Sequence, residues 1–201
     1  MALSLSVTPT VEPVTLAEVK AHLRVTHSEE DSDIEDFVIP TARQLAELAT
    51  GRALIDQTWI LRLWGFGTNV IVLPKPPLDS VTSIQYVDNE GNTQTWAASN
   101  YTVETPSGEL GLHASVQPAY NEVYPTTRNV IDSVTITYVA GYGTVASSVP
   151  AGIRKAIMMF CEDLYSQRSS QIMGSARSPA TITAESLLTR FAAPHYGLRF
   201  D

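Results

Sequence analysis

The chain has 201 residues and a formal net charge of −8, with 44% apolar and 17% charged residues. A chain of this length can bury its own core, and this composition excludes intrinsic disorder or a coiled coil as a description of the whole. No stretch approaches the roughly 18 consecutive apolar residues of a membrane span, and residues 1–9 lack the basic start and apolar run of a signal peptide. We therefore expect synthesis in the cytoplasm and no membrane partner.

The negative charge is concentrated in the first three quarters of the chain. Residues 1–149 contain 17 of the 21 acidic residues and 7 of the 13 basic ones, which gives a net charge of −10, whereas residues 150–201 carry +2. Attraction to phosphate dominates the affinity of proteins for DNA, so residues 1–149 are not expected to bind DNA specifically.

Two helices are predicted before residue 52. TLAE at 15–18 is a capping box that begins a short helix ending near Arg24. The acidic run 28–33 favours the N-terminus of a second helix, whose apolar residues Ile34, Phe37, Val38, Thr41, Leu45 and Leu48 are predicted to share one face.

Two residues shape this second helix. Gly51 is suited to end it in a left-handed conformation. Pro40 has no N–H to donate to the Asp36 carbonyl, which predicts a bend, and the apolar pattern resumes beyond it, which argues against a break.

From residue 54 to 143 the hydrophobic period changes to two and turn residues become frequent, which indicates short antiparallel strands. The last predicted strand is the clearest, because Val134, Ile136 and Tyr138 alternate with Ser and Thr. The prolines at 74, 76 and 77 cannot donate to a ladder and mark an edge or a connection.

Pro150 begins a third predicted helix, and the apolar residues from Ile153 to Leu164 form one core stripe along it. Met158 and Tyr165 lie off this stripe beside Arg154, so an apolar patch remains for a contact outside the helix's own core; packing of Met158 under the β region is the alternative. After Arg168 the chain is rich in Ser, Ala, Gly and Thr, with weak helical character at 184–191. It is expected to be a tail that a partner orders.

These elements predict an α+β fold with a small helical core of three main helices, an inserted antiparallel β region and an extended C-terminal tail. The expected domains are a helical core of residues 14–53 plus 148–168, a β-rich region of residues 54–147 and a tail of residues 169–201.

The sequence offers little for catalysis. His22 and His27 lie near the acidic run, but no HExxH or EF-hand spacing is present, and a solvated acidic helix start is the simpler interpretation. Cys161, the single cysteine, adjoins Phe160 and is expected in the core, not as a nucleophile. The glycine pairs at 65–67 and 141–143 lack the context of a phosphate loop. We predict no catalytic residue, metal or cofactor, hence not an enzyme.

Several segments in the expected order resemble the head-to-tail connector (adaptor) family of long-tailed phages, in its longer form with an inserted β region. They include VTLAEVKAHLRV at 14–25, LPKPPL at 73–78 and AGYG at 140–143. The remaining segments are 49–55, 57–59, 80–84, 101–103, 134–138 and 149–150.

The resemblance implies a structural virion protein of the neck, with subunits in a dodecameric ring beneath the portal protein. The ring extends the DNA channel, through which DNA passes without specific binding, and docks a stopper or tail-terminator protein. A C-terminal segment commonly engages the portal in this family, which makes these residues portal-binding candidates: Arg190, Phe191, Tyr196, Leu198, Arg199 and Phe200.

Two further sets of residues follow from the residue pattern. Candidates for contacts between subunits are Arg154, Met158 and Tyr165. Acidic residues that would repel DNA from the channel wall are Glu29, Glu30, Asp31 and Asp33.

Two alternative functions stay open. One is another tail-completion or baseplate protein. The other is a small enzyme or ligand-binding α+β protein, supported only by four histidines, one cysteine and abundant carboxylates.

Overall fold

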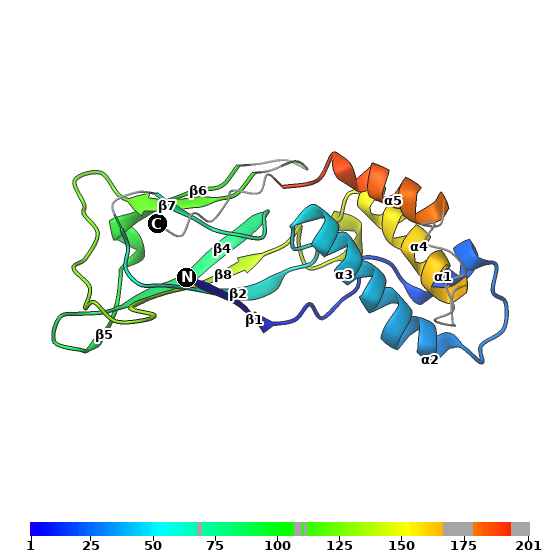
Figure 1. Cartoon of the computed structure of the whole chain (residues 1–201), viewed down its shortest axis with the longest axis horizontal. Helices are drawn as coiled ribbons and strands as arrows, with labels where there is room; N and C mark the ends of the chain where they lie inside the picture. The colour runs from blue at the N-terminus through cyan, green and yellow to red at the C-terminus, as the bar shows by residue number, and fades with distance from the viewer. Residues whose placement is uncertain (68–69, 107–109, 111, 167–178, 194–201) are drawn as a thin grey trace. The chain divides into compact units, whose positions relative to one another are not determined.

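The chain folds into one unit of strands and one unit of helices (Figure 1), which confirms the α+β class. The computed structural model describes residues 1–67, 70–106, 110, 112–166 and 179–193. The β unit consists of Met1–Pro9 and Asp56–Tyr142, and the helical unit of Thr10–Ile55 and Gly143–Asp201.

Strand β8 (Val134–Ala140) is the centre of an antiparallel five-stranded sheet. Its alternate residues Val134, Ile136, Tyr138 and Ala140 are all fully buried, as the period of two predicted. The sheet order is β1 (Ala2–Val7), β2 (Gln57–Leu63), β8, β4 (Leu78–Val87) and β5 (Thr93–Thr95).

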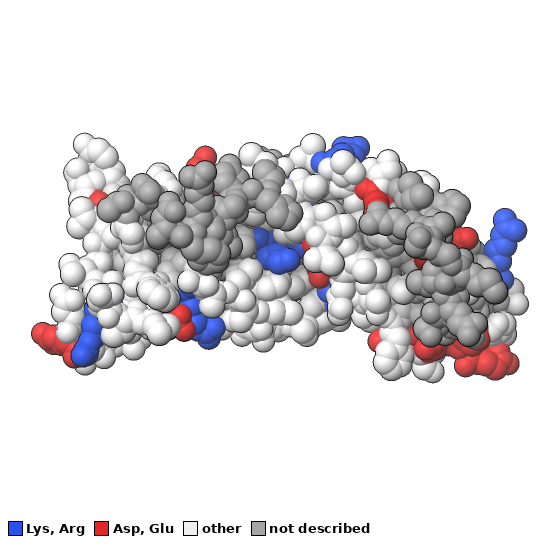
Figure 2. All heavy atoms as spheres, viewed as in Figure 1, with Lys and Arg blue, Asp and Glu red and all other residues white. Residues whose placement is uncertain are grey.

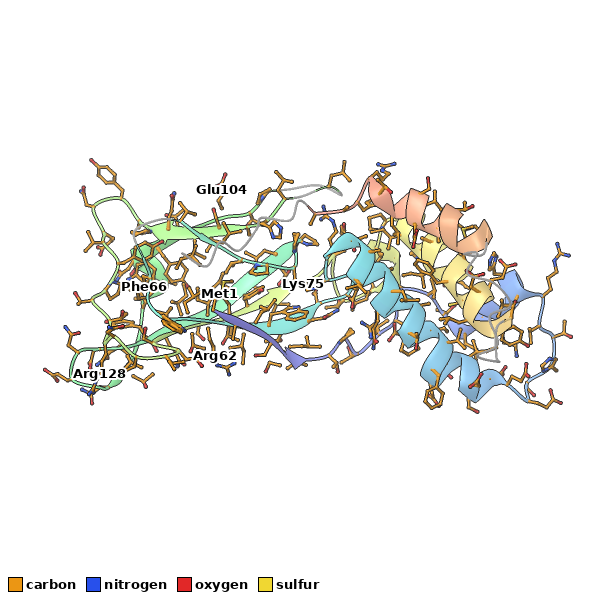
Figure 3. The ribbon with its side chains drawn as sticks, viewed as in Figure 1. Met1, Arg62, Phe66, Lys75, Glu104 and Arg128 are labelled. Carbon is orange, nitrogen blue, oxygen red and sulfur yellow. The ribbon has the colours of Figure 1, made fainter. Side chains whose placement is uncertain are left out.

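Strand β1 was not predicted from the sequence, which indicated only an extended start. It pairs with β2 from Ala2 opposite Arg62 to Val7 opposite Thr58, and so belongs to the β unit (Figure 3 labels Met1 and Arg62). Its side chains are half-buried or exposed. Leu3, Leu5 and Val7 alternate with Ser4 and Ser6, so the period of two that predicted β8 is present here too and was not used.

An aromatic cluster joins the five-stranded sheet to a three-stranded one of order β3 (Ile71–Val72), β7 (Ser115–Pro118) and β6 (Tyr101–Glu104). The ring of Phe66 lies 5.9 Å from Tyr86 of β4, 5.2 Å from Trp96 and 5.1 Å from Tyr124. Trp96 in turn contacts Tyr101 of β6 at 5.2 Å. Ring pairs at these separations are favourable beyond the area that they bury.

The proline segment connects β3 to β4, one of the two roles predicted for it. The Tyr138 hydroxyl donates to the Pro74 carbonyl at 2.9 Å, which satisfies a buried phenol on the central strand.

In the helical unit, α1 (Leu16–Leu23) begins at the predicted capping box. The Glu18 N–H donates to the Thr15 hydroxyl at 3.3 Å, and the Thr15 N–H donates to the Glu18 carboxylate at 2.9 Å. The helix ends at Arg24 with a φ of 59°. The other elements of this unit are α2 (Asp31–Asp33), the π-helix η1 (Ile34–Val38), α3 (Ile39–Thr50), α4 (Ala151–Ser166) and α5 (Pro179–Thr189).

The second predicted helix runs as α2, η1 and α3 without a break at Pro40. Directly before the proline, the Ile39 N–H donates to the carbonyl of Ile34, five residues back. This wider π turn is a known way to absorb an interruption of the ordinary ladder. The helix ends at Gly51, whose φ of 71° is the left-handed conformation expected there.

The segment 169–201 differs from the expected tail over residues 179–193. Helix α5 lies there and covers 184–189 of the weak helix predicted at 184–191, and Leu188 and Phe191 are buried in the helical unit. The Phe191 carbonyl accepts a hydrogen bond from buried Arg52, and a Cβ on Gly152 would approach the Phe191 ring at 3.1 Å. Part of the predicted tail therefore belongs to the core. The hydrophobic pattern of this short helix is too weak to predict its burial from the sequence.

Replacing Phe191 with Ala is expected to lower the free energy of unfolding of the helical unit by about 3–5 kcal/mol, because a buried ring leaves a cavity. Denaturant unfolding followed by the helical circular dichroism signal measures this. The matched control is Ala192→Ser, since Ala192 is exposed. Equal stability of the two variants would contradict the burial of Phe191.

Replacing Glu18 with Gln is expected to destabilise the helical unit at neutral pH. The bond from the Thr15 N–H, followed by the contact with Arg154, lowers the pKa of Glu18 below its ordinary value of 4.5. A carboxylate with a lowered pKa contributes stability above its unfolded pKa and loses it as the pH falls through the folded pKa. The difference from wild type should therefore be present at neutral pH and vanish in acid. Exposed Glu122→Gln serves as the control.

Candidate functional site

The acidic candidates form a corner of the helical unit around α2, where acidic atoms gather in Figure 2. Asp31 forms an ion pair with Lys20, and Glu30 accepts a hydrogen bond from the Tyr165 hydroxyl. Glu29 lies 3.0 Å from His27, and Asp33 is exposed. Glu35 and Asp36, which the sequence reasoning did not single out, are also exposed next to them.

The three α4 candidates lie on the side of α4 that α1 covers. Arg154 donates to the Pro13 carbonyl at 2.9 Å and pairs with Glu18, which ties α1 to α4. Tyr165 bonds to Glu30, and Met158 is half-buried. Two of the three therefore have contacts inside the unit, and they do not form a bare apolar patch.

The portal-binding candidates are divided. Tyr196, Leu198, Arg199 and Phe200 lie outside the described residues. Arg190 is exposed, with its guanidinium 4.8 Å from the centre of the Phe191 ring, and Phe191 itself points into the core.

A surface that sequence reasoning assigned to the core lies on α3 and η1. Phe37, Leu45 and Leu48 are 67%, 38% and 76% exposed. The expectation that the large apolar residues of this helix share the buried face is therefore wrong for these three. Ala42 and Ala46 are fully buried instead. Ile39 and Arg43 are buried on the same side of α3, so the buried face holds both small and large side chains, and Leu45 and Leu48 lie beside it.

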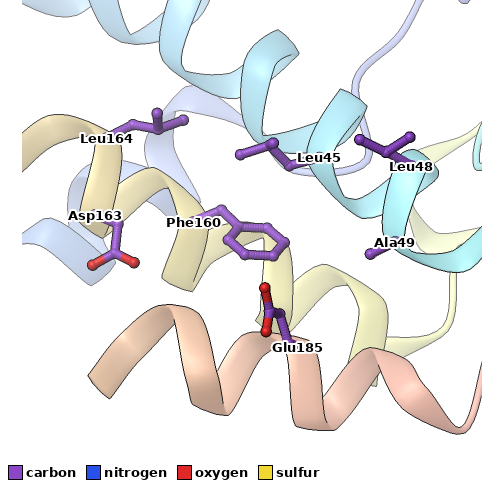
Figure 4. A pocket seen from close by; sticks show the side chains of 7 residues that line it. All are labelled: Leu45, Leu48, Ala49, Phe160, Asp163, Leu164 and Glu185. Carbon is purple, nitrogen blue, oxygen red and sulfur yellow. The ribbon is translucent and has the colours of Figure 1, made fainter. Parts of the chain in front are cut away.

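Two hollows run beside these exposed side chains. One of about 470 Å³ lies between α3, α4 and α5 (Figure 4), and its lining residues are Leu45, Leu48, Ala49, Phe160, Asp163, Leu164 and Glu185. The other, of about 510 Å³, is lined by Glu29, Glu30, Asp33, Phe37, Val38, Thr41 and Leu164. They share Leu164, and we call the two hollows together the α3 groove.

The β unit has exposed apolar side chains of its own. Trp64, Tyr120, Val123 and Ile131 are 64% to 93% exposed. A hollow of about 450 Å³ near Val123 is lined also by Val70 and Tyr124. The Ser133 hydroxyl donates to the Trp64 carbonyl at 2.6 Å, which holds the chain at the end of β2 to the residues before β8.

The groups with catalytic potential have structural contacts. Burial, with a smaller contribution from the Glu12 carboxylate, raises the pKa of Cys161 to about 12, and its side chain is fully inside the core, as predicted. His22 lies 3.2 Å from Glu162 of α4. Over the described part of the chain, no three His, Cys, Asp or Glu side chains gather as metal ligands. Nor is any helix there long and apolar enough to cross a membrane.

The sequence matches no protein-family model and no curated protein. Solved structures are similar along nearly the whole chain. A chain of a native gene transfer agent virion has a TM-score of 0.74 at 21% identity, over 96% of each chain. Chains from the neck of an empty particle, computed with C6 symmetry, and of a native particle, computed with C12 symmetry, have TM-scores of 0.73 and 0.71 at 20% and 22% identity and the same coverage. This chain has the fold of those neck chains.

In the native protein, Cys161 is expected to resist thiol reagents and to react fully once the chain is unfolded, because its thiol is buried and stays protonated. Timed labelling with an aromatic disulfide reagent measures this, with Leu48→Cys as an exposed reference. Labelling of Cys161 as fast as that of the introduced cysteine would contradict its place in the core.

Proposed function

We propose that this chain is a structural adaptor in the neck of a tailed phage or gene transfer agent particle. It assembles as a dodecameric ring beneath the portal, extends the DNA channel and docks a stopper or tail-terminator protein. It acts by assembly and not by catalysis. It is made in the host cytoplasm and resides in the virion.

The observation that carries this proposal is the likeness to neck chains over 96% of both chains. One of those necks was computed with C12 symmetry, which supports a ring of twelve copies. Coverage of nearly the whole chain matters here, because a shared module alone would match only one of the two units.

The acidic corner supports a role beside DNA that must move. Glu29 and Asp33 are exposed, and Glu35 and Asp36 add to the same surface. We assign these carboxylates, with Glu30 and Asp31, to the channel wall. Like charges there repel the phosphates, so the duplex can pass without being held.

The portal contact is assigned to exposed Arg190 and to Tyr196, Leu198, Arg199 and Phe200. Aromatic and arginine side chains are the usual anchors of an interface. Phe191 has a supporting role, because its buried ring fixes the end of α5 from which these residues continue.

The test is the native mass of the purified full chain, alone and mixed with the portal ring encoded beside it. Joining the portal in a ratio of one adaptor to one portal subunit is the expected result. A chain that binds a tail tube and no portal would move the protein to another tail-completion or baseplate position. A discrete small oligomer that carries a ligand would favour an enzyme or binding protein.

Deleting residues 194–201 is expected to abolish portal binding while the thermal unfolding of the chain is unchanged. This deletion keeps α5, Phe191 and the bond from the Ala193 N–H to the Thr50 carbonyl. Deleting 170–201 would be a poorer test, because it removes buried side chains. Normal portal binding by the shorter chain would overturn the role of the C-terminal residues.

A further inference from the structure

The α3 groove has an apolar ridge that stays exposed among the described residues of the helical unit. Phe37 and Leu48 are 67% and 76% exposed, and the intervening Leu45 is 38% exposed. Their spacing of eight and three residues places them on one side of the helix. Exposed apolar ridges of this kind mark interaction sites in soluble proteins.

A second surface lies on the side of α4 that faces away from the α3 groove. Its positions 154, 158, 162 and 165 lie on one side, and Arg154 and Glu162 contact α1 there. Positions 160, 163 and 164 line the α3 groove. At 100° per residue these two sets lie about half a turn apart around the helix. The unit therefore presents α1 on one side and the groove on the other.

The α1 side differs from the groove in shape, and it carries cations beside the carboxylates of Glu18 and Glu162. Ala17, Ala21 and Arg24 are exposed at a spacing of four and three residues, which makes a ridge of small side chains with a cation at its end. Lys155 of α4 is exposed beside it, 3.4 Å from His22. A hollow of about 500 Å³ opens there, and its lining residues are His22, Leu23, Arg24, Glu162, Tyr165 and Ser166. We call this surface the α1 edge.

We propose that the α3 groove of one copy binds the α1 edge of the next copy, head to tail. The projecting Phe37 and Leu48 meet the small side chains and the hollow of the α1 edge. Asp163 and Glu185, which line the groove beside Leu45 and Leu48, face Arg24 and Lys155 of the next copy. Complementary surfaces on opposite sides of one subunit form a heterologous contact, which closes into a ring when the rotation per subunit is suitable.

This inference rests on the proposed adaptor function and names the contact that builds its ring. It also gives the α4 candidates a role. Arg154 and Tyr165 hold α1 against α4 and the acidic corner through Glu18 and Glu30. They are positioning residues for the α1 edge, and Met158 lies on the same side of α4.

The experiment uses single-cysteine additions to the full chain, because native Cys161 is buried and gives little background. Leu48→Cys and Ala21→Cys are purified separately, mixed with the portal ring and treated with a short bismaleimide. Covalent dimers are expected in the mixture and not with either variant alone. A chain that carries both cysteines should yield a ladder of linked subunits.

The outcomes separate this proposal from the adaptor function itself. Linked dimers of Leu48→Cys alone would indicate a two-fold contact and overturn the head-to-tail arrangement. A ring of normal mass without any cross-link would overturn this contact and leave the adaptor function standing. Absence of both ring and cross-link would overturn both.

Leu48→Asp gives an independent readout. It is expected to lower incorporation into the ring at least tenfold while thermal unfolding is unchanged, because the side chain is exposed within the subunit. The matched control is Val123→Asp, an equally exposed apolar position of the β unit. Normal incorporation of Leu48→Asp would overturn the proposal.

Discussion

The close packing of α3 against α4 is the constraint on which the helical unit depends. Ala42 and Ala46 of α3 and Ala156 of α4 are all fully buried. Small side chains at a helix contact let two backbones approach closely. Leu45 and Leu48 of α3 lie beside this buried stripe and are exposed.

Helix α4 organises the rest of the unit because α1, α3 and α5 all pack against it. Ile153, Ile157 and Phe160 face the core, and α5 covers a further side through Leu188 and Phe191. Arg154 fastens α1 on the remaining side. A helix that packs against three others gives each of them a defined position.

The β unit has a comparable centre in β8, whose alternate residues are buried and whose neighbours pair with it on both sides. The aromatic cluster around Phe66 extends that core to the three-stranded sheet. This leaves the exposed apolar residues of the β unit, among them Trp64 and Ile131, outside both cores. In both units, then, a well-packed interior coexists with large apolar side chains at the surface.

The sequence by itself determined the features that depend on neighbours in the chain. These are the capping box at Thr15, the left-handed end at Gly51, the alternation of β8 and the α+β class. Their physical causes, hydrogen bonds to adjacent backbone groups and the period of buried side chains, operate within a few residues.

Only the tertiary structure decided which apolar residues are buried. Strand β1 is held by a ladder to a distant strand, and Phe191 is buried because Gly152 and Arg52 meet it from far along the chain. Ala46 is buried and Leu48 is exposed, the reverse of what hydrophobicity alone predicts, because the position of α3 against its neighbours decides which side of it is covered. Burial depends on which elements pack against one another. The sequence of a single strand or helix does not show which elements those are.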